Sequence, residues 1–177
     1  MSDFWVFGYG SLMWRPGFAH RERVPALLPG AHRSLCVYSW VHRGTRERPG
    51  LVLGLDQGGS CHGVAYRVEG GSRDDVLRYL RERELITFVY REVWRTVRLI
   101  GMGNRTVSAL AYVVDRRSPQ YAGRLPRETL LAHVRRATGR SGDNASYVVN
   151  TARHLNDLGI SDPTLTWLAA ALGRGKR

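Results

Sequence analysis

The sequence has little lysine, little cysteine and no long apolar run, and each shortage excludes a class of protein. Lys176 is the only lysine among 27 Lys and Arg residues, so no Gly-Lys-Ser/Thr phosphate-binding loop can form. We interpret Cys36 and Cys61 as reduced core thiols of a cytoplasmic protein, with a disulfide as the alternative. No apolar run approaches the roughly 20 residues that cross a bilayer, so we expect no membrane partner. Asp3 and the lack of a basic leader predict no secretory signal.

Acidic residues are also scarce, and the formal net charge of +12 raises the question of nucleic-acid binding. The arginines are spread along the whole chain, and neither an RNA-recognition signature nor zinc-ligand spacing accompanies them. We therefore expect no specific nucleic-acid partner, while weak non-specific binding stays open. The six histidines form no HxH or HxxxH pair, and no cysteine lies at metal-ligand spacing, so we expect no metal site.

The first two-thirds of the 177 residues consist mainly of segments typical of β-strands. Rich in Val, Tyr, Phe, Thr and Trp, they predict strands at 4–8, 32–40, 51–56, 61–68, 87–99 and 106–115. Gly58-Gly59 and Gly101-Met102-Gly103-Asn104 are predicted hairpin turns, which favours a mainly antiparallel, barrel-like sheet. Because helical patterns dominate the last third, we predict an α+β fold with helices packed around this sheet.

One helix is predicted to interrupt the strands, with a capping box at Ser72-x-x-Asp75 and an end near Glu84. In the last third, Pro126 is predicted to open a helix that Gly139 closes. Two further helices are predicted at 144–158 and, after a Ser-Asp-Pro cap, at 163–172. No repeat or linker is visible, so we expect a single domain over residues 1–177, with a mobile tail at 173–177.

The most informative segment is the first one, Phe4-Trp5-Val6-Phe7-Gly8-Tyr9-Gly10-Ser11-Leu12-Met13-Trp14. It predicts a buried strand that turns at two glycines and presents backbone N–H groups and the Ser11 hydroxyl, which suits a small anion or an amino-acid head group. A dinucleotide fingerprint would need glycine at position 13, and a hydrolase elbow would need glycines at positions 9 and 13. A strand that ends in a tight turn without chemistry stays the alternative.

Glu84 is the second informative feature, because its spacing places a carboxylate on an apolar face. It follows Leu80 by four residues and Val76 by eight, so a continuous helix would turn Glu84 toward the core and Glu82 toward water. Partial burial and a helix C-terminus both predict a raised pKa for Glu84, as a general base near neutral pH requires. The alternative is a frayed helix end, with Glu84 exposed or paired to a neighbouring arginine.

Several segments together resemble the ChaC-type γ-glutamylcyclotransferases, the glutathione-specific kind. They cover nearly the whole chain in the family's order: the Tyr-Gly-Ser-Leu loop within 7–14, His42-Arg43-Gly44 with Pro49-Gly50, Arg83-Glu84, Tyr121-Ala122-Gly123, Asn144-x-x-Tyr147, Leu155 and Gly159-Ile160-x-Asp162. The combination of the N-terminal loop with a later Arg-Glu is specific, whereas either alone is weak. One departure is Leu85-Ile86-Thr87, where some family members carry glycines, and it bears on where the helix ends.

The resemblance implies cleavage of glutathione to 5-oxoproline and cysteinylglycine by the substrate's own α-amine, without a metal or organic cofactor. It implies that Glu84 is the catalytic base and that residues 8–13 bind the substrate: Gly8, Tyr9, Gly10, Ser11, Leu12 and Met13. We also predict a substrate contact for the Tyr121 hydroxyl, with a packed loop aromatic as the alternative. Whether the loop holds the α-carboxylate or the oxyanion, and which arginine binds a substrate carboxylate, stays open.

Three other functions remain in competition with this one. The first is the same ring closure on another γ-glutamyl amine, which a panel of γ-glutamyl substrates separates from glutathione cleavage. The second is a non-catalytic regulator of cation transport, which would bind a transporter and leave glutathione intact. The third is a basic nucleic-acid-binding module, whose affinity would fall steeply with salt.

Overall fold

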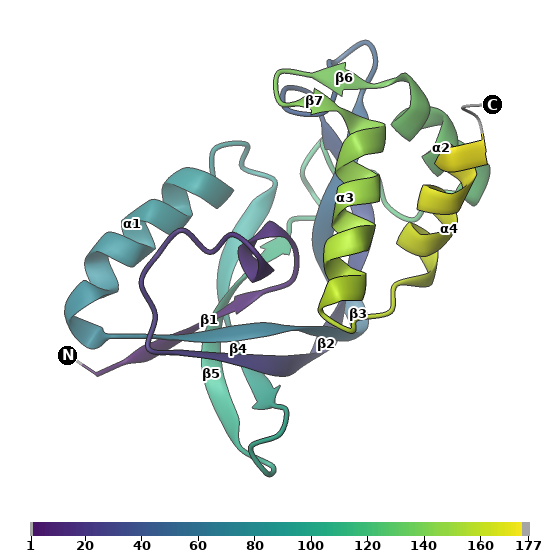
Figure 1. Ribbon diagram of the computed structural model, residues 1–177. Coiled ribbons are helices and arrows are strands. Elements are labelled where there is room, and N and C mark those ends of the chain that lie inside the picture. The colour runs from purple at the N-terminus through teal and green to yellow at the C-terminus, as the bar shows by residue number, and fades with distance from the viewer. Residues whose placement is uncertain (1, 175–177) are drawn as a thin grey trace. The chain divides into compact units, whose positions relative to one another are not determined.

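Five strands close into a barrel in the computed structural model, which describes residues 2–174 (Figure 1). In barrel order they are β1 (Phe4–Gly8), β3 (Gly50–Val68), β2 (Glu22–Ser39), β4 (Tyr90–Leu99) and β5 (Thr106–Val114). β1 runs antiparallel to β3 and parallel to β5, and β4 runs antiparallel to β2 and β5. The predicted α+β fold with a mainly antiparallel barrel is confirmed, and the β1–β5 pair makes the sheet mixed.

Contacts divide the chain into two compact units. The first contains the described residues up to Ser34 together with Gly54–Ser118, and the second contains Leu35–Leu53 and the described residues from Pro119 onward. Both β2 and β3 contribute residues to each unit. The single domain over residues 1–177 stays a prediction. Cys36 and Cys61 are both buried, as expected of core side chains.

In the first unit, helix α1 (Arg73–Glu84) packs on β1 and β5 through a buried apolar cluster. Leu80 of the helix is fully buried, and the other residues of the cluster come from α1, from three strands and from the turn after β1: Phe4, Val6, Leu12, Val68, Val76, Leu110 and Tyr112. All five residues of β1 are buried, because the helix covers one face of the strand and the barrel interior takes the other. This packing fixes the end of α1, where Glu84 lies.

β3 is one continuous strand, so the predicted hairpin turn at Gly58-Gly59 is wrong. Gly58 has φ 97° and Gly59 has φ 69°, a left-handed conformation that glycine adopts without the penalty of a side chain. Two such residues bend a strand without reversing it. The segments predicted as strands at 51–56 and 61–68 therefore belong to the same element. The other predicted turn, at 101–104, does join β4 to β5.

Two strand starts also differ from the sequence prediction. β2 begins at Glu22 and not at residue 32, although Pro25 and Pro29 lie within it. The Pro25 carbonyl still accepts a hydrogen bond from the Ile100 N–H at 2.8 Å, which shows how the strand pairs without a proline donor. β4 begins at Tyr90 and not at residue 87, because a turn closed by a Phe88 N–H to Leu85 carbonyl bond (3.2 Å) precedes it.

In the second unit, three helices contact one another: α2 (Arg127–Arg136), α3 (Asn144–Asp157) and α4 (Pro163–Gly173). The short strands β6 (Thr138–Gly139) and β7 (Gly142–Asp143) pair between α2 and α3. Asp162 caps α4 by accepting the Leu165 N–H at 3.0 Å, as the Ser-Asp-Pro sequence predicts. None of the described helices is long and apolar enough to cross a membrane.

Three predicted helix ends need correction. Ser72 makes no capping bond, because it ends a 3₁₀ turn, η2 (Gly70–Ser72), with ψ of 4° and not the extended backbone of an N-cap. The helix opened by Pro126 ends at Arg136 and not at Gly139, since Thr138–Gly139 form β6. Gly173, predicted to start a mobile tail, is the last residue of α4. Positions 175–177 of that tail lie outside the described residues.

Candidate active site

The loop after β1 turns into a short 3₁₀ helix, η1 (Ser11–Met13). At Gly8, an added Cβ would lie 3.0 Å from the Leu12 Cβ, so the turn is tight enough to favour glycine there. Leu12 and Met13 bury their side chains, while Ser11 is exposed. Among the predicted binding residues, Leu12 and Met13 therefore offer a ligand only their backbone, whereas Ser11 also offers its hydroxyl.

Side chains from β2 and β3 donate hydrogen bonds to the carbonyl groups of this loop. The Arg33 Nε donates to the Tyr9 carbonyl at 2.7 Å. The Tyr66 hydroxyl, which is fully buried, donates to the carbonyls of Leu12 (2.9 Å) and Met13 (2.8 Å). These bonds fix the direction of the loop. The N–H groups of Ser11 and Leu12, at the start of the 3₁₀ turn, precede its first internal bond and can point to a ligand.

Replacing Tyr66 with phenylalanine tests this anchoring. Tyr66→Phe keeps the ring and removes the hydroxyl, which leaves the Leu12 carbonyl in a buried setting without that donor. We expect the free energy of unfolding to fall by about 1–3 kcal/mol, measured by denaturant titration. If both the stability and the conformation of the loop were unchanged in Tyr66→Phe, the Tyr66 hydroxyl would not be what holds the loop in place.

Glu84 is the last residue of α1, and only 18% of its side chain is exposed. The helix continues to this position, and the Leu85 N–H closes it on the Arg81 carbonyl at 3.0 Å. Burial raises the pKa of the Glu84 carboxyl, and the positive charge of Arg83 lowers it by less. The predicted inward position and raised pKa are both confirmed, and Glu82 is exposed as expected. The Leu-Ile-Thr sequence that follows leaves the helix end intact.

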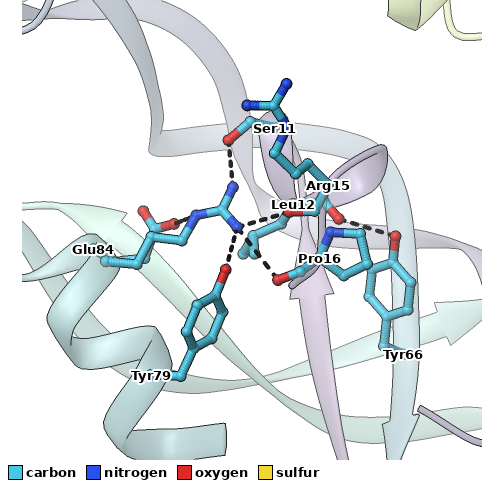
Figure 2. A network of polar contacts seen from close by, with 8 residues as sticks. Ser11, Leu12, Arg15, Pro16, Tyr66, Tyr79 and Glu84 are labelled. Carbon is cyan, nitrogen blue, oxygen red and sulfur yellow. Dashed lines mark hydrogen bonds and ion pairs between the residues drawn. The ribbon is translucent and has the colours of Figure 1, made fainter. Parts of the chain in front are cut away.

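One guanidinium group joins Glu84 to the loop after β1. Arg83 Nη2 donates to the Ser11 hydroxyl at 2.8 Å, and Arg83 Nε lies 3.4 Å from Glu84 Oε1 (Figure 2). Figure 2 shows Ser11 and Glu84 on different sides of this group, with Tyr79 below. The structure thus brings together the two features that the sequence singled out separately. The alternative of a frayed and exposed Glu84 is wrong, although its pairing with Arg83 is observed.

A second carboxylate beside the site has the opposite electrostatic setting. Arg81 binds Glu92 with two hydrogen bonds of 2.8 and 2.9 Å, which lower the pKa of Glu92 and keep it ionised. The buried Tyr112 donates to Glu92 at 3.1 Å. Burial, the charge of Glu92 and more weakly that of Glu84 raise the pKa of Tyr112, so this phenol stays protonated. Of the two carboxylates, Glu84 is the one whose surroundings favour the protonated form, so it is the better candidate for a group that exchanges a proton.

The other predicted substrate residue, Tyr121, belongs to the second unit. It forms an isolated antiparallel bridge with Val37, and its side chain is partly buried. Its role in binding stays a prediction. The Asn144-x-x-Tyr147 pair has a structural role in the same unit: the Asn144 amide exchanges two 2.8 Å bonds with the backbone of Leu51, and the Tyr147 hydroxyl accepts the Leu53 N–H at 3.1 Å.

Sequence reasoning missed the residues that support the site. Arg33, Tyr66 and Arg83 act through contacts between segments far apart in the chain, whereas the Arg81–Glu92 pair joins the end of α1 to the following strand β4. The one available signal was the adjacency of Arg83 to Glu84. No metal-binding cluster of His, Cys, Asp or Glu is found among residues 2–174.

Solved structures with the same architecture define the class of fold. The chain superimposes on the crystal structure of the yeast γ-glutamyl cyclotransferase specific to glutathione with a TM-score of 0.84, covering 98% of this chain and 97% of that one at 22% identity. The fold is therefore that of the γ-glutamylcyclotransferases.

Sequence comparison then gives the family. The profile described as ChaC-like protein matches residues 4–174. The glutathione-specific gamma-glutamylcyclotransferase of Escherichia coli (strain K12) is 35% identical over 168 residues, which span 95% of this chain and 72% of the relative. Glutathione-specific gamma-glutamylcyclotransferase 1 of Homo sapiens is 33% identical over 173 residues, 96% of this chain and 78% of that protein. The chain belongs to the ChaC-like protein family.

Proposed function

We propose that this protein is a glutathione-specific γ-glutamylcyclotransferase that releases 5-oxoproline and cysteinylglycine. The observation that carries the proposal is a buried carboxyl with a raised pKa, Glu84, held next to the Ser11 loop by Arg83. Family membership and the names of the Escherichia coli and human relatives support the choice of reaction and of glutathione as the substrate.

The proposed chemistry needs a base first and an acid second. The α-ammonium group of the γ-glutamyl unit gives a proton to Glu84, and the freed amine attacks the γ-carbonyl carbon. The new C–N bond closes a five-membered ring, and the original amide C–N bond breaks. Protonated Glu84 returns its proton to the departing cysteinyl nitrogen, and the ring nitrogen, which still carries two hydrogens after the attack, releases one of them to water, which balances the reaction. Because the nucleophile is tethered to its target, the remaining task is to hold the chain in its cyclising conformation.

In this proposal the loop after β1 stabilises negative charge. The Ser11 and Leu12 N–H groups open η1, and the loop carbonyls of Tyr9, Leu12 and Met13 are held by donors from β2 and β3. The loop therefore turns donors, not acceptors, to a ligand, as either a substrate α-carboxylate or a developing oxyanion requires. We place the γ-glutamyl group on this loop, with its α-amine toward Glu84.

The test is a panel of γ-glutamyl compounds assayed by release of 5-oxoproline. We expect glutathione to be cleaved, and γ-glutamyl amines that lack the cysteinylglycine part to react more slowly. Comparable rates on another γ-glutamyl amine would reassign the substrate within the same chemistry. No 5-oxoproline from any of them would overturn the proposal.

The raised pKa of Glu84 predicts the acid side of the pH profile. The base must be ionised in the free enzyme, so kcat/KM on glutathione should rise with pH through the pKa of Glu84. Because burial raises that pKa, the midpoint should lie above the ordinary range of a glutamic acid. Steady-state rates across the acid range measure it, and a midpoint at the value of an exposed carboxyl would contradict the assignment.

A further inference from the structure

Arg83 makes more polar contacts than the other side chains that support the site. Its Nη1 donates to the carbonyls of Arg15 (2.7 Å) and Pro16 (3.3 Å) and to the Tyr79 hydroxyl (2.9 Å). Its Nη2 donates to the Ser11 hydroxyl, and its Nε faces Glu84. Only 20% of the side chain is exposed. One planar group thus touches the first residue of η1, the segment that follows η1 and the carboxyl at the end of α1.

We propose that Arg83 is a positioning residue for the cyclisation: it locks Ser11 and Glu84 into one geometry and does not itself bind a carboxylate of the substrate. The inference rests on the proposed function, and it answers which role this arginine has among the 26 in the chain. Figure 2 shows the contacts that define it, with Arg15 and Pro16 on the loop side and Tyr79 on the helix side.

The number of N–H donors on the Arg83 guanidinium supports a positioning role and not a role in binding a substrate carboxylate. Arginine has five N–H groups, and a carboxylate bound in the usual forked way takes two parallel ones. In Arg83 the two hydrogens of Nη1 serve three acceptors, Nη2 serves Ser11, and Nε points to Glu84. One N–H of Nη2 is left over. A forked grip on a substrate carboxylate would therefore require the loop contacts to break.

The backbone around Gly17 shows that the contact surface is closely fitted. Gly17 has φ 76°, and an added Cβ there would lie 2.0 Å from the Tyr79 hydroxyl oxygen. Tyr79, a residue of α1, thus packs its hydroxyl directly against the loop while it accepts the bond from Arg83. The guanidinium and the phenol form a single tie between the two segments.

Arg83 also sets the charge environment of the base. Its positive charge opposes the effect of burial on the pKa of Glu84. The other groups that face Glu84 supply little charge: Tyr112 is protonated, and the charge of Glu92 is neutralised by Arg81. Loss of the guanidinium charge should therefore raise the pKa of Glu84 further, whereas displacement of the loop alone should not.

Two substitutions separate geometry from charge. Arg83→Lys keeps a positive charge and removes the planar fork, so we expect kcat to fall by roughly 10²-fold, as for a misplaced catalytic group, with KM changed by less than threefold. Its pH midpoint should stay near that of the wild type. Arg83→Met removes both the charge and the planar guanidinium. We therefore expect kcat to fall by a similar or larger factor and the midpoint of the pH profile to move to higher pH.

Controls make the outcome specific. Arg78→Met, on the same helix, removes an exposed arginine paired with Asp75 and should leave kcat, KM and the midpoint unchanged. Tyr79→Phe removes one hydrogen-bond acceptor of Arg83. Like Arg83→Lys, it should lower kcat without moving the midpoint of the pH profile. Because it keeps the ring and the arginine, Tyr79→Phe tests the tie even if an Arg83 variant does not fold.

A raised KM with unchanged kcat in Arg83→Lys would show that Arg83 binds substrate, and it would overturn the proposal. So would a midpoint that does not move in Arg83→Met. Amide hydrogen exchange gives a readout that needs no activity: the backbone at 11–16 should exchange faster in both Arg83 variants and not in Arg78→Met. If the wild type released no 5-oxoproline, the proposed function would fail, while the exchange experiment would still decide whether Arg83 holds the loop.

Discussion

Glu84→Gln should lower kcat on glutathione by roughly 10²–10⁴-fold, the usual contribution of a general acid–base group. The amide has nearly the shape of the carboxyl but cannot accept the α-ammonium proton. KM should change little, because the loop and its N–H groups stay in place. Release of 5-oxoproline measures the effect, and Glu82→Gln, two residues earlier and exposed, is the matched control.

The same variant should be more stable than the wild type at neutral pH. The folded-state pKa of Glu84 lies above its unfolded value, so the stability it contributes is present below the unfolded pKa and is lost as pH rises through the folded one. Glutamine avoids that loss. Thermal melts should give Glu84→Gln the higher Tm at neutral pH, with the gap closing in acid. Full activity, or a Tm that falls at neutral pH, would contradict the role of Glu84.

Gly63→Ala should have the largest effect on the fold near the site. Gly63 lies on β3, and an added Cβ would sit 2.3 Å from the Gly8 carbonyl oxygen and 2.7 Å from Phe7 Cζ. A backbone atom cannot rotate away as a side chain can, so β1 must shift. We expect the free energy of unfolding to fall by about 3 kcal/mol, at the upper end for overpacked sites. Denaturant titration measures this change.

The shift should also reduce the activity of Gly63→Ala, because Gly8 begins the loop that leads to Ser11. Gly71→Ala is the matched control: no atom lies within 4 Å of an added Cβ there. We expect Gly71→Ala to fold and react like the wild type. Equal stability of the two variants would mean that β1 and β3 are not packed this closely at Gly63.

Strand β1 and the inward position of Glu84 could be predicted because each depends on local spacing. Glu84 was visible as a carboxylate one turn after Leu80, and β1 as a buried run before two glycines. The continuity of β3 was not, since paired glycines occur both in hairpin turns and in bends of a strand, and only the partner strand decides between them. The start of β2 was hidden by Pro25 and Pro29, which local rules interpret as breaks.

The supporting residues could not be predicted for a different reason. Twenty-six arginines look alike in sequence, and Arg83 differs from the rest by what lies around its guanidinium: Ser11, Arg15 and Pro16, almost seventy positions away or more. The Tyr66 hydroxyl reaches the loop carbonyls across a similar gap of 53 or 54 residues. Contacts between residues so far apart in the sequence depend on how the strands pair in the closed barrel. The strand pattern predicts a barrel-like sheet but not this pairing.

The side chains around Glu84 include an arginine and a buried tyrosine, and this choice of residues matters for the charge of the site in alkaline solution. A guanidinium keeps its proton far above the pH at which an ammonium group would lose it, and the phenol of Tyr112 resists ionisation in its buried position. Neither of these two groups therefore changes its charge as the pH rises above neutrality. The α-amine of the substrate, by contrast, loses its own proton in that range and then needs no base to become a nucleophile.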